Sequence, residues 1–384
     1  MGGATLVPPT IRDDYLQPNN TTSNKDSVVK STGRNTPSAG KQNPKNGGMA
    51  HLREEMQNSG ISESASKLII SARSSGTRSN YDSHWKQFSS WCSEKQIDPF
   101  CCPLKDILNY LAVLFNNKKE YRTINNCRSA ISALHDPIDG FPVGQHPQVT
   151  ALLKGISKER PPLSKYTFVW DVDQVLEYME NKMSINKDLT PKDLTQKLVT
   201  LIGLTTIGRS SEIHGLTLLG MSKINNSYEI FSIGNKKHSQ QGKTDLPMKI
   251  HSFPENEALC PVRCIDAYLE MTKPWRENLG EETGNTFWLS FASPHKPVSK
   301  PTITRWIISI LNKAGIDTQS FKSHSVRAAS SSKVSKAGLS TADILIRGNW
   351  KGTTVWEKHY HKNIVTPSER FITTLLRKEQ GGKL

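Results

Sequence analysis

Hydrophobic residues recur every three or four positions between residues 61 and 160. Three stripes share this spacing: Tyr81, Trp85, Phe88 and Trp91; Leu104, Ile107, Leu108, Leu111, Leu114 and Phe115; and Ile124, Cys127, Ile131 and Leu134. Apolar residues at this interval line one face of an α-helix, and such faces pack against one another. The pattern predicts a small bundle of helices with the stripes in its core.

The second part of the chain mixes helical and strand periods. A helix is expected to begin at Thr190-Pro191, with proline in the first helical position, and to end at Arg209. Apolar residues alternate at 228–233 and 246–250 around a polar connection, which predicts a β-hairpin with a long loop. Further helices are expected at 261–271, 302–314 and 323–337 and after Ser340 and Gly352, with a short strand at 287–291. The expected fold is mainly α with a small β-hairpin or sheet.

Two stretches lack such periods. Residues 1–55 are rich in Ser, Thr, Asn, Gly, Pro and Lys, and this composition buries too little surface to offset the entropy of ordering. Residues 158–165 form a polar joint that contains two prolines. We expect a disordered tail at 1–55, a helical domain at 56–160, a linker at 161–170 and a mixed α+β domain at 171–384.

The formal net charge of +15 predicts a polyanionic partner. No apolar run approaches the length of a membrane span, so nucleic acid is favoured over a membrane; a merely basic soluble protein is the alternative. The six cysteines form no CxxC pair and Met1 opens no signal-peptide pattern, which favours the cytosol or nucleus. Cys260 and Cys264 lie one turn apart without a second ligand pair, so no metal site is expected.

Candidate chemistry gathers in residues 321–362 and at one upstream turn. The candidate residues, in chain order, are Arg209, Glu212, His324, Arg327, Trp350 and Tyr360. A guanidinium presents a fork of donors that matches two phosphate oxygens, and an imidazole one helical turn away reaches the same face. The spacing of His324 and Arg327 therefore predicts a phosphate site.

These residues, in this order, resemble the active site of the tyrosine recombinases, the phage-integrase-like family. The resemblance covers roughly residues 60–384. The sequence segments KYTFVWDV, SHSVRAAS, GNW and HYHK are most similar to those of recombinases carried by DIRS-like retrotransposons. It implies a site-specific DNA recombinase with a helical core-binding domain and an α+β catalytic domain. It also implies a nuclear enzyme that integrates a mobile element, assembles as a tetramer on paired sites and needs neither ATP nor metal.

Under this resemblance Arg209 and Arg327 grip the two non-bridging oxygens of the scissile phosphate and neutralise the charge of the phosphorane. Glu212 orients a neighbouring guanidinium or imidazole. The alternative for Glu212 is an ordinary ion pair within a helix.

Tyr360 is the expected nucleophile, and its attack would leave a 3′-phosphotyrosyl link and a free 5′-hydroxyl. His324 would handle the proton of the tyrosine. Trp350 would donate its indole N–H to the phosphate or close the site, with a core tryptophan as the alternative. The family's general acid is a lysine on the hairpin, and Lys236 fits best, followed by Lys237. A metal site at His359 and His361 is a weaker alternative.

The basic residues expected to contact DNA lie between the apolar stripes of the helical domain. They are Arg73, Arg78, Lys86, Lys118, Lys119, Arg122 and Arg128. At the other end of the chain, Thr366–Glu369 forms a capping box before a helix with Phe371, Leu375 and Leu376 on one face. In the family such a helix docks on the next protomer, and packing back on its own domain is the alternative.

Two rival functions remain at this point. A type IB topoisomerase shares the catalytic arrangement but relaxes supercoils as a monomer. A DNA-binding protein that has lost activity is the second rival, although all six motif positions are chemically competent.

Overall fold

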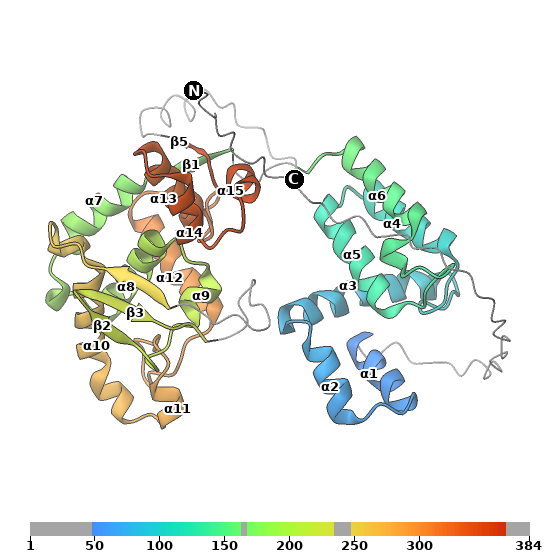
Figure 1. Ribbon diagram of the computed structural model, residues 1–384, viewed down its shortest axis with the longest axis horizontal. Helices are drawn as coiled ribbons and strands as arrows, with labels where there is room; N and C mark the ends of the chain where they lie inside the picture. The colour runs from blue at the N-terminus through green and yellow to red at the C-terminus, as the bar shows by residue number, and fades with distance from the viewer. Residues whose placement is uncertain (1–47, 163–166, 234–246, 366–384) are drawn as a thin grey trace, which may run out of the picture.

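The computed structural model describes residues 48–162, 167–233 and 247–365 and shows a mainly helical protein with small sheets, as the sequence predicted. The chain forms two lobes, each with its own hydrophobic core (Figure 1). Among the described residues, no helix is long and apolar enough to cross a membrane.

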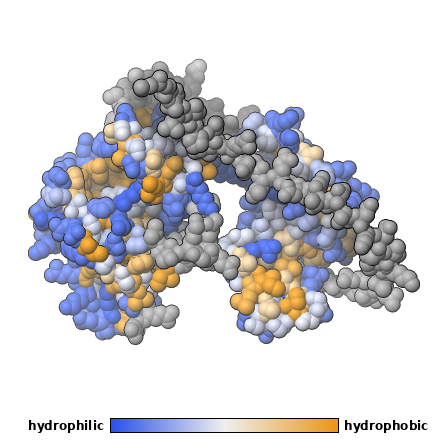
Figure 2. Space-filling view, in the orientation of Figure 1, coloured by the Kyte–Doolittle hydropathy of each residue, from blue (hydrophilic) through white to orange (hydrophobic). Residues whose placement is uncertain are grey.

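The first lobe is a bundle of helices packed around the predicted stripes. Its elements are α1 (Gly48–Asn58), α2 (Glu63–Ser71), α3 (Ser75–Glu94), α4 (Leu104–Asn116), α5 (Tyr121–Leu134), the 3-10 helix η1 (Val143–Gln145) and α6 (Pro147–Glu159). Phe88, Ile107 and Ile131 are fully buried in its core. Most of the visible surface is hydrophilic, with an apolar patch at the α1–α2 end, where Leu68 and Ile69 are exposed (Figure 2).

Helix α1 corrects the predicted tail, because it begins at Gly48, inside the stretch expected to be disordered up to residue 55. Met49 is buried in the core of the first lobe and Leu52 packs against that core. The Met49 backbone N–H also donates to the Asp82 carboxylate at 2.9 Å. Two apolar residues and one long-range hydrogen bond thus fix a segment whose composition is otherwise polar.

The second lobe is built on helix α8, whose buried residues run along almost its whole length. The elements of this lobe are β1 (Phe168–Trp170), α7 (Val172–Lys182), η2 (Asn186–Asp188), α8 (Pro191–Thr206), α9 (Ser210–His214), β2 (Ser222–Ile224), β3 (Ser227–Ile230), β4 (Met248–His251), η3 (Glu257–Leu259), α10 (Pro261–Glu277), α11 (Glu281–Gly284), α12 (Lys300–Lys313), α13 (Ser325–Lys336), α14 (Thr341–Arg347), α15 (Thr353–His359) and β5 (Asn363–Val365). Helices α10, α12 and α13 pack around α8. A helix surrounded in this way is a rigid support for residues at its end.

The predicted hairpin is confirmed as β3 and β4, which pair antiparallel with Tyr228 opposite Ile250. Strand β2, which the sequence did not predict, adds to the other edge of β3. The strand expected at 287–291 is wrong: Phe287, Trp288 and Leu289 are buried, but of these only Leu289 forms a bridge, an isolated one to Pro297. A short apolar run of this kind suits buried irregular backbone as well as a strand.

A second, parallel pair joins β1 to β5, with Val169 opposite Ile364. It brings the chain that follows Tyr360 back beside the start of the lobe. Helix α13 lies against both strands of this pair. The pair therefore holds the last described segment beside the helix that carries His324 and Arg327.

Candidate active site

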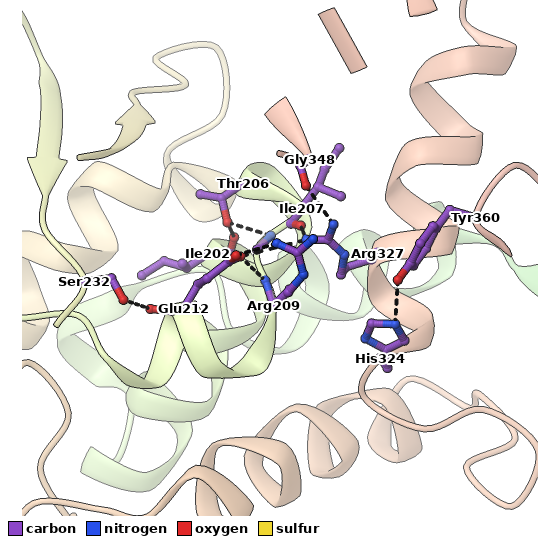
Figure 3. Close-up of polar contacts among 11 residues, drawn as sticks. Ile202, Thr206, Ile207, Arg209, Glu212, Ser232, His324, Arg327, Gly348 and Tyr360 are labelled. Carbon is purple, nitrogen blue, oxygen red and sulfur yellow. Dashed lines mark hydrogen bonds and ion pairs between the residues drawn. The ribbon is translucent and has the colours of Figure 1, made fainter. Parts of the chain in front are cut away.

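Arg209 is positioned by the turn that ends α8. Ile207 adopts the left-handed conformation, with φ 52° and ψ 28°, which costs a β-branched residue about 1–3 kcal/mol. The turn stops the helix and directs the Ile207 carbonyl toward the neighbouring helix α13, and α9 begins directly after Arg209 (Figure 3). Strain at this point is consistent with a functional turn.

Glu212 fixes both the backbone and the side chain of Arg209. One carboxylate oxygen accepts the Arg209 backbone N–H at 2.7 Å, and the other accepts its Nη1 at 2.6 Å. Both side chains are largely buried, at 14% and 10% exposure. This pair is therefore more than a surface i,i+3 ion pair, because charge-assisted hydrogen bonds away from water hold the guanidinium in one direction.

Arg327 lies in α13 and is almost completely buried, with 2% of its surface exposed. Its Nη1 donates to the Ile207 carbonyl and its Nη2 donates to the Gly348 carbonyl at 2.8 Å (Figure 3). Its Nε has no hydrogen-bond partner among the described residues. A buried donor without an acceptor costs about 1–3 kcal/mol.

Trp350 and Tyr360 cover the Arg327 guanidinium. Its Cζ lies 4.5 Å from the Trp350 ring centroid and 5.4 Å from that of Tyr360. Gly348 is required beneath this stack, because a Cβ there would overlap the Trp350 ring. Trp350 thus packs over the charge through a cation–π contact.

Tyr360 is the C-cap of α15 and is half-buried. Its hydroxyl lies 3.0 Å from His324 Nε2, and the two rings meet edge to face (Figure 3). His324 is the N-cap of α13, whose first turn is tied to β1 by a 2.8 Å hydrogen bond from Trp170 Nε1 to Ser325 Oγ. A proton acceptor is therefore within direct reach of the phenol.

The site carries more positive than negative charge. Two guanidiniums, of Arg209 and Arg327, share one carboxylate, and Arg327 Nη1 lies 4.0 Å from Glu212 Oε2. Burial, and then the nearby Arg209 charge, lower the pKa of Arg327 to about 10, while Glu212 and Tyr360 act in the opposite direction. Arg327 stays protonated at neutral pH, so an anion is the ligand that balances this site.

Comparison with known proteins agrees with this geometry. The model of the phage integrase family matches residues 170–364, just over half of the chain. The chain belongs to the phage integrase family. It is accordingly an enzyme of the tyrosine recombinase class, whose members cleave and rejoin DNA strands. No curated protein matches the chain.

A solved structure of the same class shares the fold, and others are similar to the chain. The XerH site-specific recombinase bound to difH substrate, in a pre-cleavage complex, aligns with a TM-score of 0.51 and 11% identity over 85% of this chain and 83% of its own. The Tn1549 transposon integrase in complex with transposon right end DNA gives 0.47 and 15% over 86% and 99%. A lambda integrase tetramer bound to a Holliday junction gives 0.43 and 14% over 88% and 79%.

The structure brings together six of the residues expected to act in this phage integrase family member. They are Arg209, Glu212, His324, Arg327, Trp350 and Tyr360. Lys236 and Lys237 lie outside the described residues. His359 and His361 flank the tyrosine, and His361 stacks on Trp356 at 4.6 Å. In the described part of the chain, no three His, Cys, Asp or Glu side chains are arranged to hold a metal ion.

The predicted DNA-contacting residues occupy different environments in the first lobe. Lys86, Lys118, Lys119 and Arg122 are exposed, and Arg73 and Arg78 are half-buried. Arg128 differs from the rest: its Nη1 donates to the Gly144 carbonyl at 2.8 Å, and its Nε and Nη2 donate to Asn125 Oδ1. The contact with Gly144 holds η1 against α5, so the Arg128 guanidinium is engaged within the lobe.

Sequence reasoning missed the two carbonyl groups that hold Arg327. They belong to Ile207 and Gly348, which stand 120 and 21 positions from Arg327 in the chain. Backbone acceptors carry no residue-type signal. Only the glycine in the Gly348-Asn349-Trp350 turn could have indicated a close approach of backbone to an aromatic ring.

Proposed function

We propose that this protein is a site-specific DNA recombinase in which Tyr360 attacks a phosphodiester and forms a covalent 3′-phosphotyrosyl intermediate. The observation that carries the proposal is the Tyr360 hydroxyl, 3.0 Å from His324 Nε2 and beside the buried Arg327 guanidinium. A nucleophile, a proton acceptor and a fixed cation therefore meet at one point, as phosphoryl transfer to a side chain requires.

In the proposed reaction, the Tyr360 oxygen forms a bond to phosphorus as His324 accepts its proton. The guanidiniums of Arg209 and Arg327 take the non-bridging oxygens, so that the charge of the phosphorane is stabilised. Lys236 protonates the leaving 5′-oxygen. Because the phosphotyrosyl bond retains the energy of the phosphodiester, the reverse attack by a 5′-hydroxyl rejoins the strand without ATP.

The first lobe is proposed to act as the core-binding domain that covers one side of the duplex. Its exposed Lys86, Lys118, Lys119 and Arg122 would contact phosphates, which gives affinity without sequence preference. The catalytic lobe would cover the opposite side. The basic stretch at 1–47, outside the described residues, would add to DNA affinity or to nuclear import.

We also propose that the enzyme assembles as a tetramer on paired sites through its C-terminal segment. A cavity of about 440 Å³ beside α13 and α14 supports this; its apolar lining includes Leu176, Leu204, Val334 and Ile344. The apolar face of Phe371, Leu375 and Leu376, outside the described residues, suits this cavity on a second copy. The similarity of the segments KYTFVWDV, SHSVRAAS, GNW and HYHK to recombinases of DIRS-like retrotransposons further supports a nuclear enzyme that integrates a mobile element of this kind.

The test is incubation with nicked suicide substrates that carry each terminal sequence of the DNA element encoding the protein. A terminus that is a substrate should yield a protease-sensitive adduct joined through the 3′-phosphate, because the freed 5′-fragment diffuses away. Absence of any adduct with all termini would overturn the proposal. Plasmid relaxation by the monomer, without strand exchange between paired sites, would instead favour a topoisomerase.

A further inference from the structure

Ser332 lies on α13, the helix that carries Arg327, and its side chain makes hydrogen bonds to the backbone on the C-terminal side of Tyr360. Its Oγ donates to the Tyr360 carbonyl oxygen at 2.9 Å and accepts the Lys362 backbone N–H at 2.9 Å. Only 2% of Ser332 is exposed. Both hydrogen bonds are therefore partly shielded from water, which strengthens them.

The two preceding serines make no comparable contacts. Ser331 Oγ lies 3.3 Å from the Ala328 carbonyl oxygen and 3.5 Å from that of Tyr360, at the limit of hydrogen bonding. Ser330 Oγ is buried with no hydrogen-bond partner among the described residues. Of these three consecutive serines, Ser332 is the one that makes two hydrogen bonds of ordinary length to the segment after α15.

This segment needs such a hold. Tyr360 is the C-cap of α15, so no further helical turn supplies an N–H donor to its carbonyl, and only His361 and Lys362 separate it from β5. The Tyr360 N–H is already bound to the Trp356 carbonyl at 2.7 Å. With Ser332 on the other side, the peptide groups on both sides of the Tyr360 Cα are fixed.

We propose that Ser332 is a positioning residue that keeps the Tyr360 hydroxyl in line with the phosphate held by Arg327. The inference rests on the proposed function, since it assumes Tyr360 as the nucleophile. One helix, α13, then sets the proton acceptor, the phosphate ligand and the backbone of the nucleophile relative to one another. A displacement of about 1 Å in a reacting group can cost about a hundredfold in rate, and two backbone hydrogen bonds are a direct means to prevent it.

The experiment compares Ser332→Ala, Ser331→Ala and Ser330→Ala on the suicide substrate that wild type cleaves. Single-turnover cleavage at saturating DNA should fall roughly ten- to a hundredfold in Ser332→Ala, with a smaller decrease in Ser331→Ala and none in Ser330→Ala. DNA affinity should stay within about twofold in all three, because none of these side chains is exposed. Equal rates for Ser332→Ala and Ser330→Ala would overturn the inference.

A 5′-bridging phosphorothioate separates positioning of the nucleophile from leaving-group chemistry. It should restore cleavage in Lys236→Ala, which lacks the proposed acid, and fail to restore Ser332→Ala; rescue of Ser332→Ala would contradict the positioning role. If Ser332→Ala melts well below Ser330→Ala, a second variant is Ser332→Cys, which fills the space of the hydroxyl but makes weaker hydrogen bonds, and it should show the same decrease in rate. An inactive wild type would refute the proposed function, whereas an active wild type with an unaffected Ser332→Cys would refute this inference alone.

Discussion

The lysines and arginine proposed to bind DNA in the first lobe and the buried arginine of the site in the second lobe occupy opposite environments. In the first lobe, Lys118, Lys119 and Arg122 are exposed, whereas in the second lobe Arg327 is 2% exposed and is held by two backbone carbonyls. Exposed charges are screened by salt and can replace one another. A buried guanidinium cannot be replaced, because its position is set by the surrounding structure. The first environment suits affinity for a polyanion and the second suits chemistry on one phosphate.

Among the variants that test this contrast, Arg327→Lys should lower the rate of cleavage most. A lysine keeps the charge but cannot span the Ile207 and Gly348 carbonyls and still offer a donor to phosphate. Cleavage of the suicide substrate should fall at least ~100-fold. Arg347→Lys is the matched control, because it changes one hydrogen bond, from Nε to the Thr205 carbonyl at 3.0 Å. Similar decreases in the two variants would contradict the special role of the buried site.

Gly348→Ala should have the next largest effect. The added methyl would overlap the Trp350 ring, so the ring that covers Arg327 must move. We expect the free energy of unfolding in denaturant to fall by about 1–3 kcal/mol and cleavage to fall roughly tenfold, with DNA affinity retained. In Gly352→Ala the new Cβ would meet no atom within 4 Å, and this variant should behave as wild type. A wild-type rate in Gly348→Ala would show that the stack over Arg327 does not need its present geometry.

The smallest effect on the enzyme is expected from a double variant of the first lobe, Lys118→Ala with Lys119→Ala, which should change only the salt dependence of DNA affinity. The slope of log Kd against log salt should fall by up to about 2, at ~0.9 for each phosphate that the variant no longer neutralises. Cleavage at saturating DNA should stay unchanged. The exposed pair Lys182 and Lys273, replaced by alanine, alters the net charge equally and should leave the slope as it is. An identical change in both pairs would mean that net charge alone determines affinity.

The same contrast explains which features could be predicted from the sequence. The helices of the first lobe follow from local spacing, which one sequence displays. The motif of Arg209, His324, Arg327 and Tyr360 was found through its resemblance to a known family, in residue type and order. The contacts that support this motif carry no such signal: Arg327 is held across 120 positions by the Ile207 carbonyl, and β1 pairs with β5 across nearly the length of the lobe. Helix α1 was missed because its buried core residue, Met49, stands in a polar stretch.

The central claim, that Tyr360 is the nucleophile, is tested most directly by Tyr360→Phe on the nicked suicide substrate. The change removes one oxygen and keeps the ring, so the fold and DNA affinity should be retained while the only atom able to bond to phosphorus is removed. Tyr178→Phe, at a half-buried tyrosine of α7, is the matched control. Denaturing electrophoresis should show the 3′-linked adduct with wild type and Tyr178→Phe and none with Tyr360→Phe. An adduct formed by Tyr360→Phe would contradict the account.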